Sequence, residues 1–205
     1  MNTLRVNDIC FFERDYFMKK LKITFNSPVV LGFIFICLAV LVLGFATLGK
    51  SNELLFMTYH SSLTNPLTYV RFFTHVLGHS GWEHYIGNAA YILLLGPMLE
   101  EKYGSRKLLQ VIVITALVTG LMNYILFPNV ALCGASGVVF AFILLTSFTS
   151  FKNGEIPLTF ILVAVIFLGQ QVYEGVFLQD NISNLSHVMG GIIGSVVGYK
   201  LNKKR

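Results

Sequence analysis

Four polar residues from three separate parts of the sequence have side chains that together could cleave an amide bond. Ser136 lies within a Gly-Ala-Ser-Gly stretch, His187 lies near the end of the chain, and His84 and Asn88 are one helical turn apart. A serine hydroxyl becomes a useful nucleophile when a histidine takes its proton. Side-chain N–H groups stabilise the oxyanion that forms when a carbonyl is attacked. These residue types indicate acyl-transfer chemistry, provided that the fold brings them together.

The composition indicates the environment in which they would work. Only 12% of the 205 residues are charged and 55% are hydrophobic, whereas a soluble domain carries about 25% charged residues. Long uncharged runs alternate with short charged clusters, a pattern typical of proteins that cross a membrane several times. Basic residues flank these runs, so the net charge of +5 predicts orientation in a bilayer rather than nucleic-acid binding. The fold class predicted is an all-α polytopic membrane protein.

Six apolar segments are predicted to cross the bilayer, at about 29–48, 81–100, 108–127, 136–151, 157–172 and 185–201. They would form one membrane domain over 28–202, after a cytoplasmic leader over 1–27 and before a basic tail over 203–205. The long first connection, 49–82, combines polar and aromatic residues, which suits a segment lying in the membrane interface. Ser80 and Glu83 have the spacing of a capping box at the start of the second segment.

The positive charges predict the orientation. With the leader inside, the inner side receives its lysines, the turn at 100–107, Lys152 and the tail, and only Lys50 and Arg71 lie outside. Cytoplasmic loops carry the excess of lysine and arginine, so both termini are expected in the cytoplasm. The second, fourth and sixth segments then enter from the outer face, and each carries its candidate catalytic residue at that end.

The fourth segment is short for a membrane span. Its 16 residues, 136–151, cover about 24 Å, against a hydrocarbon core of about 30 Å. If its inner end reaches the cytoplasmic surface, Ser136 lies below the outer one, where non-helical backbone is tolerated only against protein or a water-filled cavity. A recessed, hydrated serine is expected. His187 is its candidate base, and because the last segment holds no carboxylate, we expect a Ser–His dyad.

Small residues at regular spacing also have a packing explanation, because glycine and serine let membrane helices approach closely. Ser186, Gly190, Gly194 and Gly198 repeat every four residues. This pattern predicts a face that packs the last segment against the fourth one. The same explanation is the alternative for the glycines around Ser136, and a helix–helix hydrogen bond is the alternative for Asn88.

The chain resembles the rhomboid intramembrane serine proteases, of the bacterial six-span type. Its matching motifs lie within about residues 66–200 and occur in the order found in that family: Arg71-Phe72-Phe73-Thr74-His75, His79, His84-x-x-x-Asn88, Glu100-x-x-x-Gly104, Gly134-Ala135-Ser136-Gly137 and His187-x-x-Gly190-x-x-x-Gly194.

The resemblance implies a six-helix bundle in a bacterial inner membrane and a serine endopeptidase. It implies Ser136 as nucleophile, His187 as general base and acid, and His84 and Asn88, with the backbone N–H of Ser136, as the oxyanion hole. The substrates would be single-span or polytopic membrane proteins, cleaved within their transmembrane segments near the outer face. No cofactor, metal or nucleic acid is implied.

Five further residues are expected to support this site: Gly134 and Gly137 through the backbone, His79 in the cavity wall, Arg71 as a tether of the first connection, and Phe140. Two positions depart from the family pattern. Val70 precedes Arg71 where many members have tryptophan, so the anchoring of this connection is expected to differ. Position 140 is phenylalanine where many members have tyrosine. The phenylalanine ring can still stack on His187, but it offers no hydroxyl.

Three other functions would each leave a different signature in the sequence. A rhomboid-like protein that binds membrane clients without cutting them is the main alternative, although such proteins lack Ser136 or His187. A transporter using histidines as proton carriers would be expected to show paired intramembrane charges or repeats, and a zinc protease would be expected to show an HExxH motif. The sequence shows none of these patterns.

Gln170 and Gln171, near the outer end of the fifth segment, are interpreted as polar groups at a helix end.

Overall fold

The computed structural model describes residues 23–150, 155–177 and 181–202, and the regular structure in these ranges is helical. This confirms the predicted all-α class. The longer helices are α2 (Pro28–Ala46), α4 (Trp82–Tyr103), α5 (Ser105–Leu126), α6 (Ser136–Ser147), α7 (Leu158–Phe177) and α8 (Asn181–Asn202). Residues 1–22 of the predicted leader over 1–27, the predicted turn at 151–154 and the predicted tail over 203–205 lie outside the described residues.

The connection between α2 and α4 contains three short elements. They are η1 (Asn52–Phe56), α3 (Pro66–Thr74) and η2 (His75–Leu77). α3 begins at Pro66, and the side chain of Asn65 accepts a hydrogen bond from the backbone N–H of Leu67 at 3.0 Å. A capping asparagine followed by proline at the first helical position is a favourable helix start.

The predicted capping box at the start of α4 is wrong. α4 begins at Trp82, with Gly81 as its N-cap and no side-chain cap. The side chain of Ser80 instead lies 3.1 Å from Nδ1 of His84. The serine therefore pairs with a side chain one turn into the helix rather than with the backbone.

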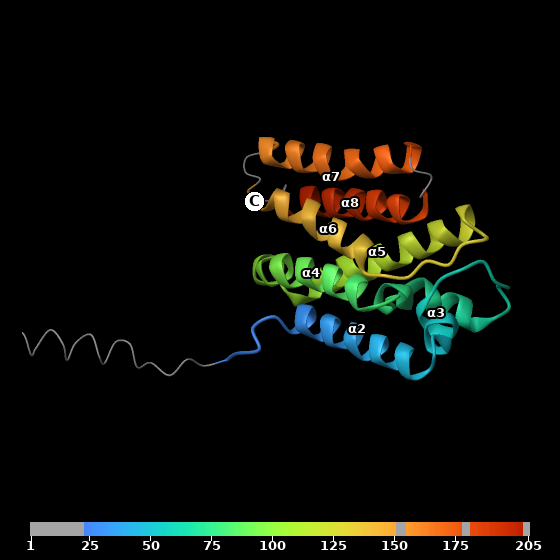
Figure 1. Ribbon diagram of the computed structural model, residues 1–205. Helices are drawn as coiled ribbons and strands as arrows, with labels where there is room; N and C mark the ends of the chain where they lie inside the picture. Colours follow the sequence, from blue (N-terminus) through green and yellow to red (C-terminus); the bar gives the residue numbers. More distant parts are fainter. Residues whose placement is uncertain (1–22, 151–154, 178–180, 203–205) are drawn as a thin grey trace, which may run out of the picture.

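α6 is the central helix of the bundle. It packs against α4, α5, α7 and α8, and its side chains from Gly137 to Leu145 are buried except that of Phe140. In Figure 1, α2 lies at one edge of the bundle and α7 at the other, with α4, α6 and α8 between them. The residue that opens α6, Ser136, is thus placed among helices from both halves of the chain.

The predicted packing face of α8 is confirmed. A Cβ atom added to Gly190 would collide with the carbonyl oxygen of Gly137, and one added to Gly194 would collide with that of Ala141. Gly198 lies against the ring of Phe148. Because backbone meets backbone along this line, α8 is held in one register beside α6.

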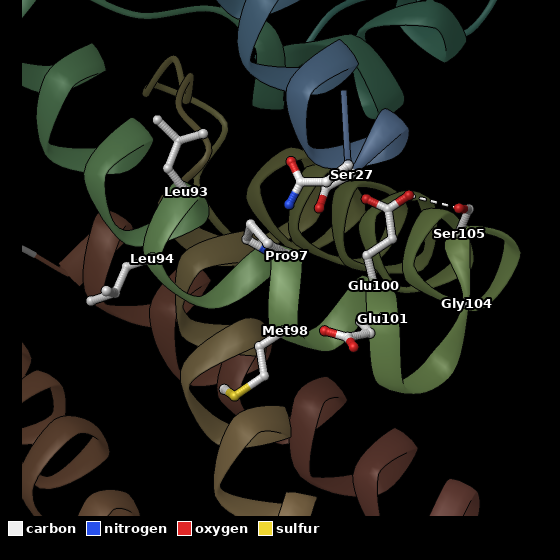
Figure 2. A pocket seen from close by; sticks show the side chains of 10 residues that line it. Ser27, Leu93, Leu94, Pro97, Met98, Glu100, Glu101, Gly104 and Ser105 are labelled. Atoms are coloured by element: carbon white, nitrogen blue, oxygen red, sulfur yellow. Dashed lines mark hydrogen bonds between the residues drawn. The ribbon is translucent and has the colours of Figure 1, made fainter. Parts of the chain in front are cut away.

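Glu100, near the inner end expected for α4, ties that end to the start of α2. Its carboxylate accepts hydrogen bonds from the backbone N–H groups of Val29 and Val30, each at 3.0 Å. It also accepts one from Oγ of Ser105 at 2.6 Å, which Figure 2 shows as a dashed line. The first N–H groups of a helix have no partner within the helix, and the helix dipole favours negative charge there. Glu100 therefore caps α2 from a distant part of the sequence.

A cavity of about 600 Å³ lies beside this contact. Its lining combines the apolar side chains of Leu93, Leu94, Pro97 and Met98 with polar residues that include Ser27, Glu100 and Glu101 (Figure 2). None of the candidate catalytic residues lines this cavity, so its size does not mark the site.

Among the described residues, two helices, α2 and α5, are long and apolar enough to cross a membrane, while α6 and residues 158–173 of α7 are shorter apolar helices. Large apolar side chains such as Phe35, Leu94 and Val165 are exposed on the outside of the bundle. Exposed apolar area of this extent suits a lipid environment.

Candidate active site

The backbone before Ser136 has a conformation that requires glycine. Gly134 has φ +126°, outside the range that L-residues with a side chain adopt. A Cβ atom at this position would also lie 2.6 Å from Nε2 of His84 and 3.9 Å from Nδ2 of Asn88. The structure therefore brings His84 and Asn88 of α4 against the backbone two residues before Ser136, which is itself half-buried.

The side chains of His84 and Asn88 can both offer N–H groups to a molecule bound beside Gly134. Nδ2 of Asn88 is buried and has no hydrogen-bond partner among the described residues. The backbone N–H of Ser80 donates to Nδ1 of His84 at 3.5 Å. When Nδ1 accepts, the proton of the neutral ring is on Nε2, the atom that faces Gly134. An unpaired donor is costly to bury, so the arrangement suits an acceptor that arrives with a substrate.

His187 reaches the same region through the contact of α8 with α6. A Cβ atom on Gly137 would lie 3.4 Å from the carbonyl oxygen of Ser186, which places the residues next to Ser136 and His187 in direct contact. The His187 ring stacks on that of Phe140, with centroids 4.4 Å apart and planes at 4°. The predicted stacking is confirmed.

Gln171 is a residue of the site whose role was not predicted from the sequence. It is buried in α7, and its Oε1 lies 2.5 Å from Nδ1 of His187. The interpretation of Gln171 as a helix-end polar group is therefore wrong. A polar amide within an apolar segment was the available signal, because such groups are rare and tend to face the bundle interior.

The segment that leads into Ser136 is held by the connection between α2 and α4. Thr58 and Leu132 form an isolated antiparallel bridge with N–H···O distances of 2.9 and 2.8 Å. The N–H of Gly134 donates to the carbonyl of His75 at 2.9 Å, and Asn123 donates to the carbonyl of Thr58 at 3.1 Å. The first connection thus positions the backbone beside the serine.

Arg71 anchors that connection, as predicted for a tether. Its guanidinium donates to the carbonyl of Leu54 at 3.2 Å and to Oγ of Ser61 at 2.8 Å. The group also lies 4.4 Å from the ring centroid of Tyr59, a favourable cation–π geometry. Arg71 is only 2% exposed, so its charge is buried against carbonyl, hydroxyl and aromatic groups.

Two buried histidines lie behind the site. His75 contacts the carbonyl of Arg71 through Nδ1 and Oγ1 of Thr119 through Nε2, both at 3.2 Å. The ring of His79 packs edge-on against that of His84, with centroids 5.0 Å apart. Burial lowers the pKa of both His75 and His79 to about 4, so both rings are neutral at neutral pH.

Comparison with known proteins places the site within a matched region. The family model described as the rhomboid domain matches residues 66–204. The chain is 25% identical over 173 residues to rhomboid protease GlpG of Haemophilus influenzae, covering 82% of this chain and 88% of that protein. It is 29% identical to rhomboid-related protein 1 of Caenorhabditis elegans, over 63% of this chain and 39% of that protein. It is also 29% identical to rhomboid-related protein 2 of Mus musculus, over 67% and 52% respectively.

Proposed function

This chain belongs to the rhomboid family, and we propose on that basis that it cleaves membrane-protein substrates with a Ser136–His187 dyad. It is an integral membrane protein and a serine intramembrane protease, a hydrolase that acts within the bilayer. The dyad, the oxyanion hole and the position of the cleaved bond are the finer parts of the proposal.

The first step is attack by Ser136 on the substrate carbonyl. Nε2 of His187 takes the hydroxyl proton, Oγ of Ser136 bonds to the carbonyl carbon, and the carbonyl oxygen becomes an oxyanion. His187 then gives the proton to the leaving amine, and an acyl-enzyme remains. A water molecule, deprotonated by the same histidine, hydrolyses the ester and restores Ser136.

The oxyanion would be stabilised by Nε2–H of His84, Nδ2–H of Asn88 and the backbone N–H of Ser136. The observation that carries the proposal is that Gly134 lies against both α4 side chains while Gly137 lies against Ser186. Ser136 stands between these two contacts, so it is flanked by the oxyanion donors on one side and the helix of its base on the other.

The membrane arrangement completes the proposal. Six helices cross the bilayer, and both termini are in the cytoplasm of a bacterium, as the positive charges predict. The first connection lies at the outer interface. The scissile bond is then within the outer part of a transmembrane segment of a single-span or polytopic substrate, because Ser136 is at the outer end of α6.

The test is cleavage of a model single-span substrate by purified protein in vesicles. We expect cleavage by wild type and none by Ser136→Ala or His187→Ala. Ser147→Ala, on the same helix, is the matched control, because Oγ of Ser147 bonds only to the carbonyl of Ile143 among the described residues.

A serine-directed fluorophosphonate provides the second measurement. It should label wild type and Ser147→Ala but not Ser136→Ala. Cleavage by the Ser136→Ala protein would overturn the assignment of the nucleophile. Substrate binding without cleavage or labelling by wild type would favour a client-binding role.

A further inference from the structure

Gln171 contacts the nitrogen of His187 that the proposed chemistry leaves unused. Its Oε1 lies 2.5 Å from Nδ1, and the side chain is only 7% exposed. An amide oxygen only accepts hydrogen bonds, so Nδ1 carries the proton in this contact. A neutral imidazole has a single N–H group, so Nε2 is then the unprotonated nitrogen. The contact selects the tautomer that can take a proton from Ser136.

We infer that Gln171 is a positioning residue that makes His187 a competent base, so that the dyad works as a Ser–His–Gln triad. This inference rests on the proposed function. When Nε2 takes the proton of Ser136, the ring becomes an imidazolium whose Nδ1–H stays bonded to Gln171. When Nε2 passes the proton to the leaving amine, the same bond keeps the ring in place for the next step. Gln171 itself neither gains nor loses a proton.

Two neighbours restrain the ring in complementary ways. Phe140 of α6 lies parallel to its face, which fixes the plane of the ring. Gln171 of α7 holds one edge, which fixes the rotation within that plane. A ring restrained in both ways presents Nε2 in one direction, and small errors in such an orientation cost large factors in rate.

The contact also makes the base depend on the docking of α7. This helix lies at the edge of the bundle, beside α8 (Figure 1), and packs chiefly on α8 and α6. The partner of His187 thus comes from a different helix, one with fewer neighbours than α6 or α8. Any displacement of α7 that breaks the Gln171 contact removes the interaction that keeps the proton of the neutral His187 ring on Nδ1.

A glutamine differs from the carboxylate of other serine-protease triads in a testable way. An amide can turn its NH₂ group toward Nδ1 and stabilise the wrong tautomer, whereas a carboxylate only accepts. Gln171→Glu would keep the correct tautomer and add a negative charge that favours the protonated ring. Gln171→Leu would keep the bulk and remove the acceptor.

The experiment measures kcat, KM and the pH–rate profile of substrate cleavage for these two variants. We expect Gln171→Leu to lower kcat about 10- to 100-fold with little change in KM. We expect Gln171→Glu to retain cleavage, with the acidic limb of its profile moved to higher pH. Gln170→Leu is the matched control, because this neighbouring side chain is exposed, and it should behave as wild type.

A spectroscopic measurement makes the result independent of cleavage. Nitrogen NMR of ¹⁵N-histidine protein, with the His187 signals assigned by their loss in His187→Ala, reports which ring nitrogen is protonated. Wild type should show a proton on Nδ1, and Gln171→Leu a mixture of tautomers. A proton on Nε2 in wild type would overturn the inference.

The inference would also be wrong if Gln171→Leu kept the kcat and the pH profile of wild type. It would be wrong too if both Gln171 variants lost activity equally together with thermal stability, because that result indicates packing alone. Failure of the proposed function has a different signature: wild type itself would neither cleave the substrate nor react with the fluorophosphonate.

Discussion

Buried polar side chains near the two ends of α4 differ in whether their hydrogen bonds are already made. Near one end, Glu100 is buried, and both carboxylate oxygens accept hydrogen bonds from α2, with Ser105 adding a third. Near the other end, Nδ2 of Asn88 is equally buried and has no partner among the described residues. The first pattern stabilises a fold, because all the strong interactions are made in the resting protein. The second leaves an interaction to be made later, as expected of a group that stabilises a transition state.

The first prediction tests this contrast at Asn88. Asn88→Leu keeps most of the side-chain volume and removes the N–H donor. We expect kcat to fall about 10²- to 10³-fold, the usual effect of losing one oxyanion donor. Thermal stability should be unchanged or higher, because a buried donor without a partner has been removed.

The measurement pairs substrate cleavage with thermal unfolding of the same preparation. Asn123→Leu is the control, because this buried asparagine donates to two carbonyls, of Thr58 and Val130, and its loss should destabilise the protein. If Asn88→Leu lowered stability as much as Asn123→Leu does, Asn88 would be a structural residue and the contrast would fail.

How far the sequence predicts this region depends on whether its contacts are local. The motif containing Ser136, the turn-spaced pair on α4 and the glycine repeat of α8 are patterns within single segments, and the α6–α8 contact follows from them. The helix bounds are less well predicted, because apolar runs do not fix where a helix ends: α7 continues to Phe177 rather than 172, and α8 begins at Asn181 rather than 185. The bridge of Thr58 with Leu132 has no such pattern, since one backbone hydrogen-bonded pair leaves no trace in residue type.

Gln171 shows the same limit for a side chain. A glutamine near a helix end has an ordinary explanation, and only the packing of α7 on α8 shows which residue its amide meets. The capping box failed for a local reason. Ser80 and Glu83 have the right spacing, but the hydroxyl of Ser80 lies 3.1 Å from Nδ1 of His84, four residues further on, and so pairs with a side chain instead of a backbone N–H.

The second prediction concerns the opposite end of α4. Glu100→Gln removes the charge that caps α2 and leaves its first N–H groups with weaker partners. We expect the free energy of unfolding to fall by about 2 kcal/mol, the scale of hydrogen bonds to a charged group, while the folded fraction keeps its kcat. Chemical denaturation in detergent measures the loss. Glu101→Gln, its exposed neighbour, should be neutral, and an equal effect of both substitutions would contradict the capping role.

The third prediction uses pH to test the two buried histidines behind the site, His75 and His79. Burial lowers the pKa of His75 from 6.5 to about 4, so between these values the unfolded chain binds a proton that the folded protein does not. Stability should therefore fall as pH decreases through this window, by on the order of 1 kcal/mol from pH 6 to pH 5. His75→Gln should flatten the slope, and the slope that persists should come from His79, whose pKa is lowered in the same direction. An unchanged slope in His75→Gln would show that this ring is not neutral when folded.

The smallest effect is expected where the chain departs from the family pattern, at Phe140. Its ring contributes to the site by lying parallel to His187, and a tyrosine ring can make the same contact. We expect Phe140→Tyr to cleave the substrate with a kcat within about threefold of wild type, and Phe140→Leu, which has no ring, to lose more. Since Nδ1 of His187 is already bonded to Gln171, a tyrosine hydroxyl at position 140 is not needed as a hydrogen-bond partner for that nitrogen. A large gain from Phe140→Tyr would mean instead that the imidazole is incompletely restrained in this chain, and that the Gln171 contact does less than its geometry indicates.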